Sequence, residues 1–311
     1  MKITETISKL LDKIFLYDRW NIGYLRQTPE NLILTQKLNG DVNWLTEDTV
    51  DYAADPFVIQ VNGKTHLYYE ELNFWKGKGE IMMTDDMLFK NKKKVKGIVN
   101  DAIHLSYPYL FTVQNQLYCI PETATARQVA LYQIDEKDPC RFKKIRLLLE
   151  GEAFVDSSIV YFKNKYWLFS SMSRKPGKLY IFHADGLDAP FKPHSLNPIN
   201  VAFNVNRSAG RLFIVDQRLY MPTQNPEKCY GGSVMINEIT NISETEFQYQ
   251  TAFELLPQPP YDKGLHTINF AGGLMVIDGK RKVFSALGPL KKIIGKIRNL
   301  KFWQWNPIHT S

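Results

Sequence analysis

The feature that most constrains the fold is a repeat with a period of about 50 residues. Each copy has a short apolar run, a tight turn centred on Asn, Asp or Gly, and a second run rich in aromatic or branched residues, as in "AADPFVIQVNGKTHLYYEE" (53–71). A run, turn and run of this kind predicts a β-hairpin. The copies begin near residues 55, 107, 156, 209 and 266, and the last is the weakest. A fixed period of this length indicates a repeat architecture.

Further strand-like segments lie between the copies, such as "VALYQID" (129–135) and "KLYIFHADG" (178–186). Two strands from each copy and two between copies give four per unit, so five units predict an all-β fold, a five-bladed β-propeller. A two-sheet sandwich is the alternative, but it does not explain the period. Helical periodicity is confined mainly to the two ends. We therefore expect a helical extension over 1–20, a propeller over 21–287 and a basic amphipathic tail over 288–311.

Matched positions of the repeat point to a site. The first strand of each propeller blade lines the central channel, so polar residues at corresponding points of these strands converge on the axis. Asp55 and Asp156 match in copies one and three, and Tyr107, Ala209 and His266 are their counterparts in copies two, four and five. The sequence therefore predicts two carboxylates, a tyrosine and a histidine around one cavity.

Two of these motifs carry a resemblance. Asp-Pro-Phe at 55–57 and Val-Asp-Ser-Ser at 155–158 resemble the five-bladed glycoside hydrolase superfamily of arabinanases, xylosidases, invertases and levansucrases. The chain is more closely similar to the N-terminal propeller domain of plant glucosamine inositolphosphorylceramide transferase and its bacterial relatives. The stretches that match this domain are "HLSYPYLF" (104–111), "IPET" (120–123), "HSLNPI" (194–199), "RSAGRLF" (207–213), "YGGSVMINEI" (230–239) and "GLHTIN" (264–269).

The resemblance implies roles for three carboxyl groups. Cleavage of a glycosidic bond needs one protonated and one ionised carboxyl group beside the sugar. The resemblance places the base or nucleophile on Asp55 and a supporting role on Asp156. The hydrolases carry their acidic glutamate after the second aspartate, typically one blade on, where this chain has Arg207, Arg211 and Gln224. Glu122 is our candidate for the acid.

A second set of residues is predicted to bind the substrate, each with a structural alternative such as pairing between blades. The set comprises His104, Tyr107, Arg207, Arg211, Tyr230, Glu238 and His266. The arginines would favour an anionic ligand such as a nucleotide sugar or a lipid-linked sugar. Tyr230 and the Gly231-Gly232 pair would form a platform for sugar stacking, although a tight turn also explains the glycines.

Composition limits the setting. The three cysteines have no metal-ligand spacing, and the N-terminal residues lack the apolar core of a signal peptide, so we expect a cytoplasmic protein. No nucleotide-binding, P-loop or zinc motif occurs, and we expect no cofactor and no metal. The net charge of +7 is partly concentrated in "LKKIIGKIRNLKFWQW" (290–305). This tail packs on the domain, lies on an anionic membrane at the inner face, or contacts nucleic acid, the last being least expected.

Together these observations predict a carbohydrate-active propeller that acts on a glycan or glycolipid by glycosyl transfer or hydrolysis, in surface polysaccharide or glycolipid assembly. The alternative is a propeller that binds a glycan without catalysis or serves as a scaffold. The alternative follows from the missing glutamate in copy four.

Overall fold

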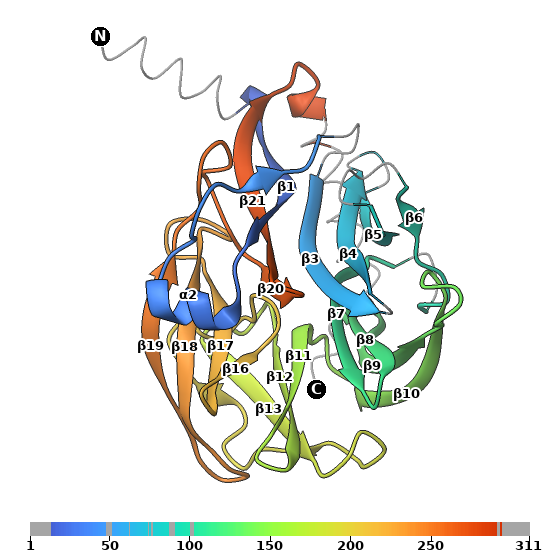
Figure 1. Cartoon of the computed structure of the whole chain (residues 1–311), viewed down its shortest axis with the longest axis vertical. Helices are drawn as coiled ribbons and strands as arrows, with labels where there is room; N and C mark the ends of the chain where they lie inside the picture. The colour runs from blue at the N-terminus through green and yellow to red at the C-terminus, as the bar shows by residue number, and fades with distance from the viewer. Residues whose placement is uncertain are drawn as a thin grey trace.

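The computed structural model describes residues 14–47, 52–61, 63–73, 75, 77–86, 91–99, 103–290 and 293. These residues form five antiparallel sheets around a central axis (Figure 1). The predicted all-β, five-bladed propeller is therefore confirmed, and the sandwich is excluded. Within the described ranges, no helix is both long and apolar enough to cross a membrane.

The first three blades follow one another along the chain. Blade one contains β3 (Tyr52–Val61), β4 (Lys64–Asn73), β5 (Lys78–Thr84) and β6 (Lys93–Lys94). Blade two contains β7 (Ser106–Val113), β8 (Gln116–Glu122), β9 (Gln128–Ile134) and β10 (Phe142–Glu150). Blade three contains β11 (Val155–Phe162), β12 (Lys165–Ser171), β13 (Lys178–Ala184), β14 (Lys192–Pro193) and β15 (Ile199–Asn200).

Blade four is also continuous along the chain, whereas blade five combines strands from the two ends of the described chain. Blade four contains β16 (Phe213–Val215), β17 (Arg218–Asn225), β18 (Ser233–Ile242) and β19 (Phe247–Leu255). Blade five contains β20 (Ile268–Ala271), β21 (Leu274–Phe284), β1 (Leu16–Arg26) and β2 (Asn43–Trp44). The helix α2 (Pro29–Thr35) connects β1 to β2, and the short 3-10 helix η1 (Ala124–Ala126) follows β8.

The inner hairpins have the turns that the sequence predicts. The two residues between β7 and β8, Gln114 and Asn115, have φ of 49° and 64°. Gly272 and Gly273, between β20 and β21, also have positive φ, 58° and 74°. Left-handed backbone at both central positions matches the twist of the strands that such a turn joins. The same turn geometry therefore recurs around the ring.

The closure of the ring corrects the expected N-terminal extension. Residues 16–20 lie in β1, which pairs with β21 from Leu16 opposite Phe284 to Arg26 opposite Leu274. Pairing with a strand from the other end of the chain overrides the local helical periodicity. Residues 1–13 of the extension lie outside the described residues. Of the expected C-terminal tail, residues 288–290 and 293 are helical, and the remainder also lies outside the described residues.

The apolar core lies between neighbouring blades. One cluster joins blades one, two and three through residues such as Phe57, Tyr109 and Leu168. Other clusters join blade three to blade four and blade four to blade five. Each sheet therefore buries both faces, which fixes the inner strands around the axis.

Arg211 links inner strands at the axis. It precedes β16 and donates from Nε to the carbonyl oxygen of Leu110 (3.1 Å), from Nη1 to that of Phe270 (3.2 Å) and from Nη2 to that of Val58 (3.4 Å). These carbonyls belong to β7, β20 and β3. One side chain of blade four thus holds strands of blades one, two and five. Its role here is structural, in contrast to the substrate contact that the sequence suggested.

We expect Arg211→Met to lower the free energy of unfolding by about 3 kcal/mol, because it removes three hydrogen bonds from a charged donor and leaves their acceptors unpaired. Urea denaturation measures the change. Arg218→Met is the matched control, since Arg218 is an exposed side chain that only approaches Glu238 at 3.7 Å. An equal loss in both variants would contradict the role of Arg211 at the axis.

Candidate active site

The first strands of blades one, two and three are kinked at the matched position. Asp55, Tyr107 and Asp156 have φ of 51°, 42° and 49°. The pairing register is interrupted at each of them, so each lies in a β-bulge. Positive φ at a non-glycine residue costs roughly 1–3 kcal/mol and is concentrated at functional sites. The repeat therefore marks three equivalent, strained positions beside the axis.

Each kinked residue is held by a carboxylate of the preceding blade. The backbone N–H of Asp55 donates to Oδ2 of Asp278 (3.1 Å), and that of Tyr107 donates to Oδ2 of Asp55 (3.3 Å). The N–H of Asp156 donates to Oε2 of Glu122 (3.1 Å). The acceptors belong to blades five, one and two respectively. These bonds draw the carboxyl groups to the channel.

Asp278, which the sequence analysis did not select, is fully buried on β21. Besides the N–H of Asp55, it accepts the backbone N–H groups of His266 (2.9 Å) and Thr267 (3.0 Å). Its Oδ2 also lies 2.5 Å from Nδ1 of His266. One carboxylate thus fixes both the histidine and the kink at Asp55.

His266 lies between two carboxylates. Its Nε2 is 3.5 Å from Oδ1 of Asp55, which also accepts the hydroxyl of Thr267 (2.8 Å). Burial lowers the pKa of His266, but the carboxylates of Asp278 and Asp55 more than offset this, and the pKa is raised above its ordinary value. Burial raises the pKa of Asp55 to about 6, with His266 acting against the rise and Asp156 adding to it.

Among the described residues, Asp55, His266 and Asp278 form a group that could hold a metal ion, since one ligand atom of each lies within 4.8 Å of the others. A metal would require an imidazole without a proton on the bound nitrogen. Here both ring nitrogens face carboxylates, and Asp278 already accepts three backbone N–H groups. We therefore interpret the three as an ion-pair network.

Asp156 is the centre of a second group. Its Oδ2 accepts Nε of Arg207 and Nε2 of Gln224 (3.3 Å). Burial raises the pKa of Glu122 to about 8, Asp156 adds to the rise, and Arg207 acts against it. Blade four therefore contributes a cation and an amide at the place where the resemblance led us to look for a glutamate.

Glu70, on β4, is a member of the cluster that the prediction left out. It is 4% exposed, accepts the hydroxyl of Tyr52 (3.2 Å), and lies 3.3 Å from Nε2 of His104. Glu70 pairs with Ala54 as Glu122 pairs with Ser106, so the two glutamates are equivalent in blades one and two. Both lie 15 residues after the kinked position, a spacing that the sequence already contained.

An aromatic rim adjoins the carboxyl cluster. Tyr230 is 53% exposed, and its ring lies 5.5 Å from Cζ of Arg207. The ring of Trp20 packs on His266 with centroids 4.2 Å apart. Gly231, with φ of 59°, crosses so close to Trp20 that an added Cβ would lie 2.6 Å from its ring. The glycine is therefore needed for this close approach, and Tyr230 is left facing outward.

Two other predicted ligands face elsewhere. The hydroxyl of Tyr107 bonds to Ser158 (2.9 Å) and to the carbonyl and N–H of Gly210 (3.0 and 2.8 Å), so the fully buried Tyr107 ties blades two, three and four together. Glu238, on β18, the third strand of blade four, accepts Nε2 of Gln250 (3.0 Å). Spacing alone could not tell which way these side chains point.

Comparison with known proteins shows the family of this chain. The family model described as glucosamine inositolphosphorylceramide transferase 1, N-terminal, matches residues 32–261, more than half of the chain. The chain belongs to this family. Glucosamine inositolphosphorylceramide transferase 1 of Oryza sativa subsp. japonica is 28% identical over 206 residues, which are 64% of this chain and 27% of the relative. The family member described here thus spans about a quarter of the length of that relative.

Solved structures share the fold of this family member. An α-L-arabinofuranosidase from Podospora anserina, in complex with cellotriose, has a TM-score of 0.53 at 12% identity, covering 76% of this chain and 94% of the other. A family 117 glycoside hydrolase from Zobellia galactanivorans has a TM-score of 0.52 at 11% identity, covering 86% and 91%. At these identities the likeness establishes the fold.

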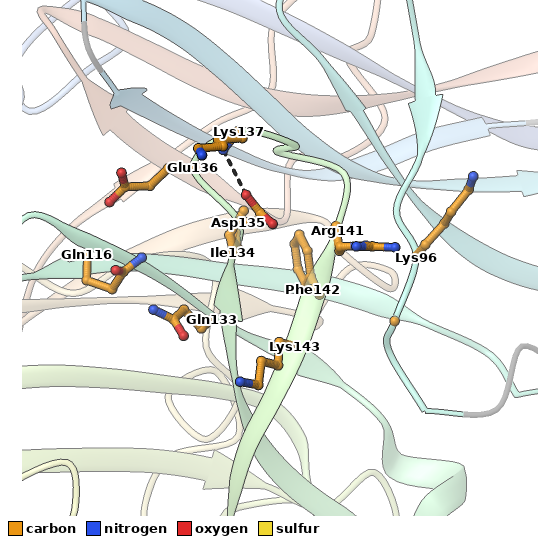
Figure 2. A pocket seen from close by; sticks show the side chains of 11 residues that line it. Lys96, Gln116, Gln133, Ile134, Asp135, Glu136, Lys137, Arg141, Phe142 and Lys143 are labelled. Atoms are coloured by element: carbon orange, nitrogen blue, oxygen red, sulfur yellow. Dashed lines mark hydrogen bonds between the residues drawn. The ribbon is translucent and has the colours of Figure 1, made fainter.

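A separate hollow lies on the outer part of blade two (Figure 2). It is lined by the end of β9, the start of β10 and the segment around Lys96, with charges of both signs such as Asp135 and Arg141. None of the clustered carboxyl groups lines it. We therefore take the cluster of buried carboxyl groups beside the inner strands, and not this hollow, as the candidate site of this family member.

We expect Asp278→Asn to lower the free energy of unfolding by about 3 kcal/mol, because one amide oxygen cannot replace a buried carboxylate that accepts three N–H groups and pairs with His266. Chemical denaturation measures this. Asp262→Asn, at an exposed aspartate bound to its neighbour Lys263, should leave the transition unchanged. If both variants unfold like wild type, Asp278 does not hold the kink.

Proposed function

We propose that this propeller binds a glycan or glycolipid at the end of its channel and acts on a glycosidic bond by transfer or hydrolysis. One observation carries the proposal: carboxyl groups with opposite preferences for the proton share one cluster. Burial raises the pKa of Asp55 to about 6 and that of Glu122 to about 8. Near pH 7, Asp55 is ionised and Glu122 is protonated.

This division matches the chemistry of a glycosidic bond. A protonated carboxyl group donates to the leaving oxygen, while an ionised one attacks the sugar or activates the acceptor. We assign the base or nucleophile to Asp55 and the acid to Glu122. Asp156 pairs with Arg207, and its backbone N–H donates to Glu122.

The aromatic rim supports a sugar ligand. Tyr230 offers an exposed ring beside the carboxyl groups, and a sugar stacks on such a face while its hydroxyls reach polar groups. The family adds support, since its named members are glycolipid transferases, and the solved neighbours include two glycoside hydrolases. A nucleotide-linked or lipid-linked sugar would suit Arg207 at the rim.

A location at the inner membrane face is part of the proposal. Leu287, Leu290 and Ile293 are 54%, 47% and 53% exposed, and they lead into the basic, apolar sequence of residues 294–305. Such a composition favours an anionic membrane surface, where a lipid-linked substrate would lie.

A binding function without turnover is the second candidate. It is favoured by the blade-four position, where Arg207 and Gln224 bind Asp156 in place of a third carboxyl group. A binder would keep sugar affinity when Asp55 is changed, whereas an enzyme would lose turnover.

We expect a thermal-shift screen of neutral and acidic oligosaccharides, nucleotide sugars and glycolipid headgroups to raise the Tm of wild type with at least one compound. Tyr230→Ala should weaken that binding at least tenfold, because it removes the stacking face. Tyr161→Ala, at an exposed tyrosine of blade three, is the matched control. If none of the compounds shifts Tm, the protein is not a carbohydrate-binding propeller.

With a compound that is turned over, the rate should follow a bell-shaped pH profile with limbs near pH 6 and pH 8. Activity falls below the lower limb because Asp55 becomes protonated, and above the upper limb because Glu122 loses its proton. Initial rates between pH 4.5 and 9.5 provide the measurement. Asp55→Asn should lower kcat at least 1,000-fold. A flat profile would contradict the assigned pair, and binding without turnover would favour the second candidate.

A further inference from the structure

One carboxyl group of the cluster has no role in the proposed chemistry. Glu70 lies on β4 and is 4% exposed. Both nearby donors lie beside the same carboxyl oxygen, Oε1. The hydroxyl of Tyr52 donates to Oε1 (3.2 Å), and Nε2 of His104 is 3.3 Å from Oε1. Oε2 has no hydrogen-bond partner within the described part of the chain.

The hydrogen on His104 can be placed. The backbone N–H of Gly79 donates to its Nδ1 (2.9 Å), so this nitrogen carries no hydrogen and Nε2 does. Burial lowers the pKa of His104 to about 4, which keeps the ring neutral near pH 7. An N–H group of a neutral imidazole therefore faces Oε1 of Glu70.

The position of Oε1 is fixed from a third side. An added Cβ at Gly79 would lie 2.2 Å from this oxygen, so the glycine backbone packs directly against it. The hydroxyl of Tyr52 donates to Oε1, and the Nε2–H of His104 faces the same oxygen at 3.3 Å, so the donors of this site gather at Oε1 and not at Oε2. A proton on this carboxyl group must then lie on Oε2.

The groups around Glu70 favour the protonated form of its carboxyl group. The titratable groups that act on Glu70 are the carboxyl groups of Asp55, Glu122 and Asp156, the Tyr52 hydroxyl on β3, and His104. Burial raises the pKa of Glu70 well above its ordinary value, and Asp55 adds to the rise. Of the described basic side chains near the cluster, His266 faces the carboxyl group of Asp55 and Arg207 pairs with that of Asp156.

We propose that Glu70 determines specificity in this site: it is a carboxylic acid whose Oε2–H donates a hydrogen bond to an oxygen of the bound sugar. The inference rests on the proposed function. It assigns Glu70 a role distinct from that of Glu122, because its proton is retained for binding and not transferred. A site built to bond one sugar oxygen discriminates strongly against an analogue that lacks it.

Glutamine is the matched substitution. A glutamine at this position presents an acceptor at Oε1 and an N–H donor in place of Oε2–H, so Glu70→Gln reproduces the protonated acid. Glu70→Ala removes both groups. Glu238→Gln, on the third strand of blade four, is the control outside the cluster.

The first arm needs no ligand. If the fold keeps Glu70 protonated, the unfolded chain releases this proton above the ordinary pKa of a glutamate, 4.5, and the folded chain does not. The unfolding constant of wild type, relative to that of Glu70→Gln, should therefore rise as the pH is raised above about 5, by up to tenfold per pH unit. Urea denaturation at four pH values measures the ratio. If this ratio does not change with pH, or changes only as much as the ratio of wild type to Glu238→Gln, the inference is wrong. The proposed function is not affected by that outcome.

The second arm measures affinity for the compound that gives the largest shift in the sugar screen. Glu70→Gln should keep Kd within threefold of wild type, and Glu70→Ala should raise it at least tenfold. Equal Kd values for Glu70→Ala and wild type would overturn the contact. If no compound binds wild type, the proposed function fails and the contact fails with it, whereas the first arm separately decides whether Glu70 keeps its proton.

Discussion

The structure depends on three backbone N–H groups that donate to a side-chain oxygen of the neighbouring blade instead of to a partner strand of their own sheet. At Asp55, Tyr107 and Asp156 the inner strand turns into the left-handed region, and the N–H leaves the ladder. A buried N–H without an acceptor is costly. Each therefore requires an oxygen from the blade before it, and Asp278, Asp55 and Glu122 provide these oxygens. The same hydrogen bonds therefore hold neighbouring blades together and fix the positions of the carboxyl groups.

The same arrangement divides the carboxyl groups into two kinds. Buried like charges cannot all ionise together. Asp55 has His266 beside it and Asp156 has Arg207, so these two are the ones whose charge is compensated. The pKa values of Glu70 and Glu122 are raised by burial and by their acidic neighbours. The cations thus lie beside the two aspartates, whereas burial and acidic neighbours favour the protonated form of the two glutamates.

The sequence predicted the fold well because each copy of the repeat is a local signal. Hairpin turns, strand lengths and the equivalence of positions 55, 107 and 156 all depend on residues close together in the chain. The pairing of β1 with β21 could not be predicted in this way, because the two strands are far apart in sequence and residues 3–16 have helical periodicity.

Side-chain direction set a further limit on the predicted site. Arg207 and Arg211 are four residues apart, yet Arg207 pairs with Asp156 at the cluster and Arg211 bonds carbonyl groups at the axis. Asp278 follows an apolar run in β21 and is not at a matched position of the repeat, so the sequence did not mark it as a site residue. Glu70 could have been found, since its distance from Asp55 equals that of Glu122 from Tyr107.

The aromatic support of His266 has a consequence for how the protein is made. Trp20 belongs to β1, near the start of the described chain, and His266 and Asp278 belong to the last blade to be synthesised. During translation, β1 lacks its partner β21 until that strand has been synthesised. Closure of the ring and the packing of Trp20 on His266 are therefore coupled, because both depend on the pairing of β1 with β21.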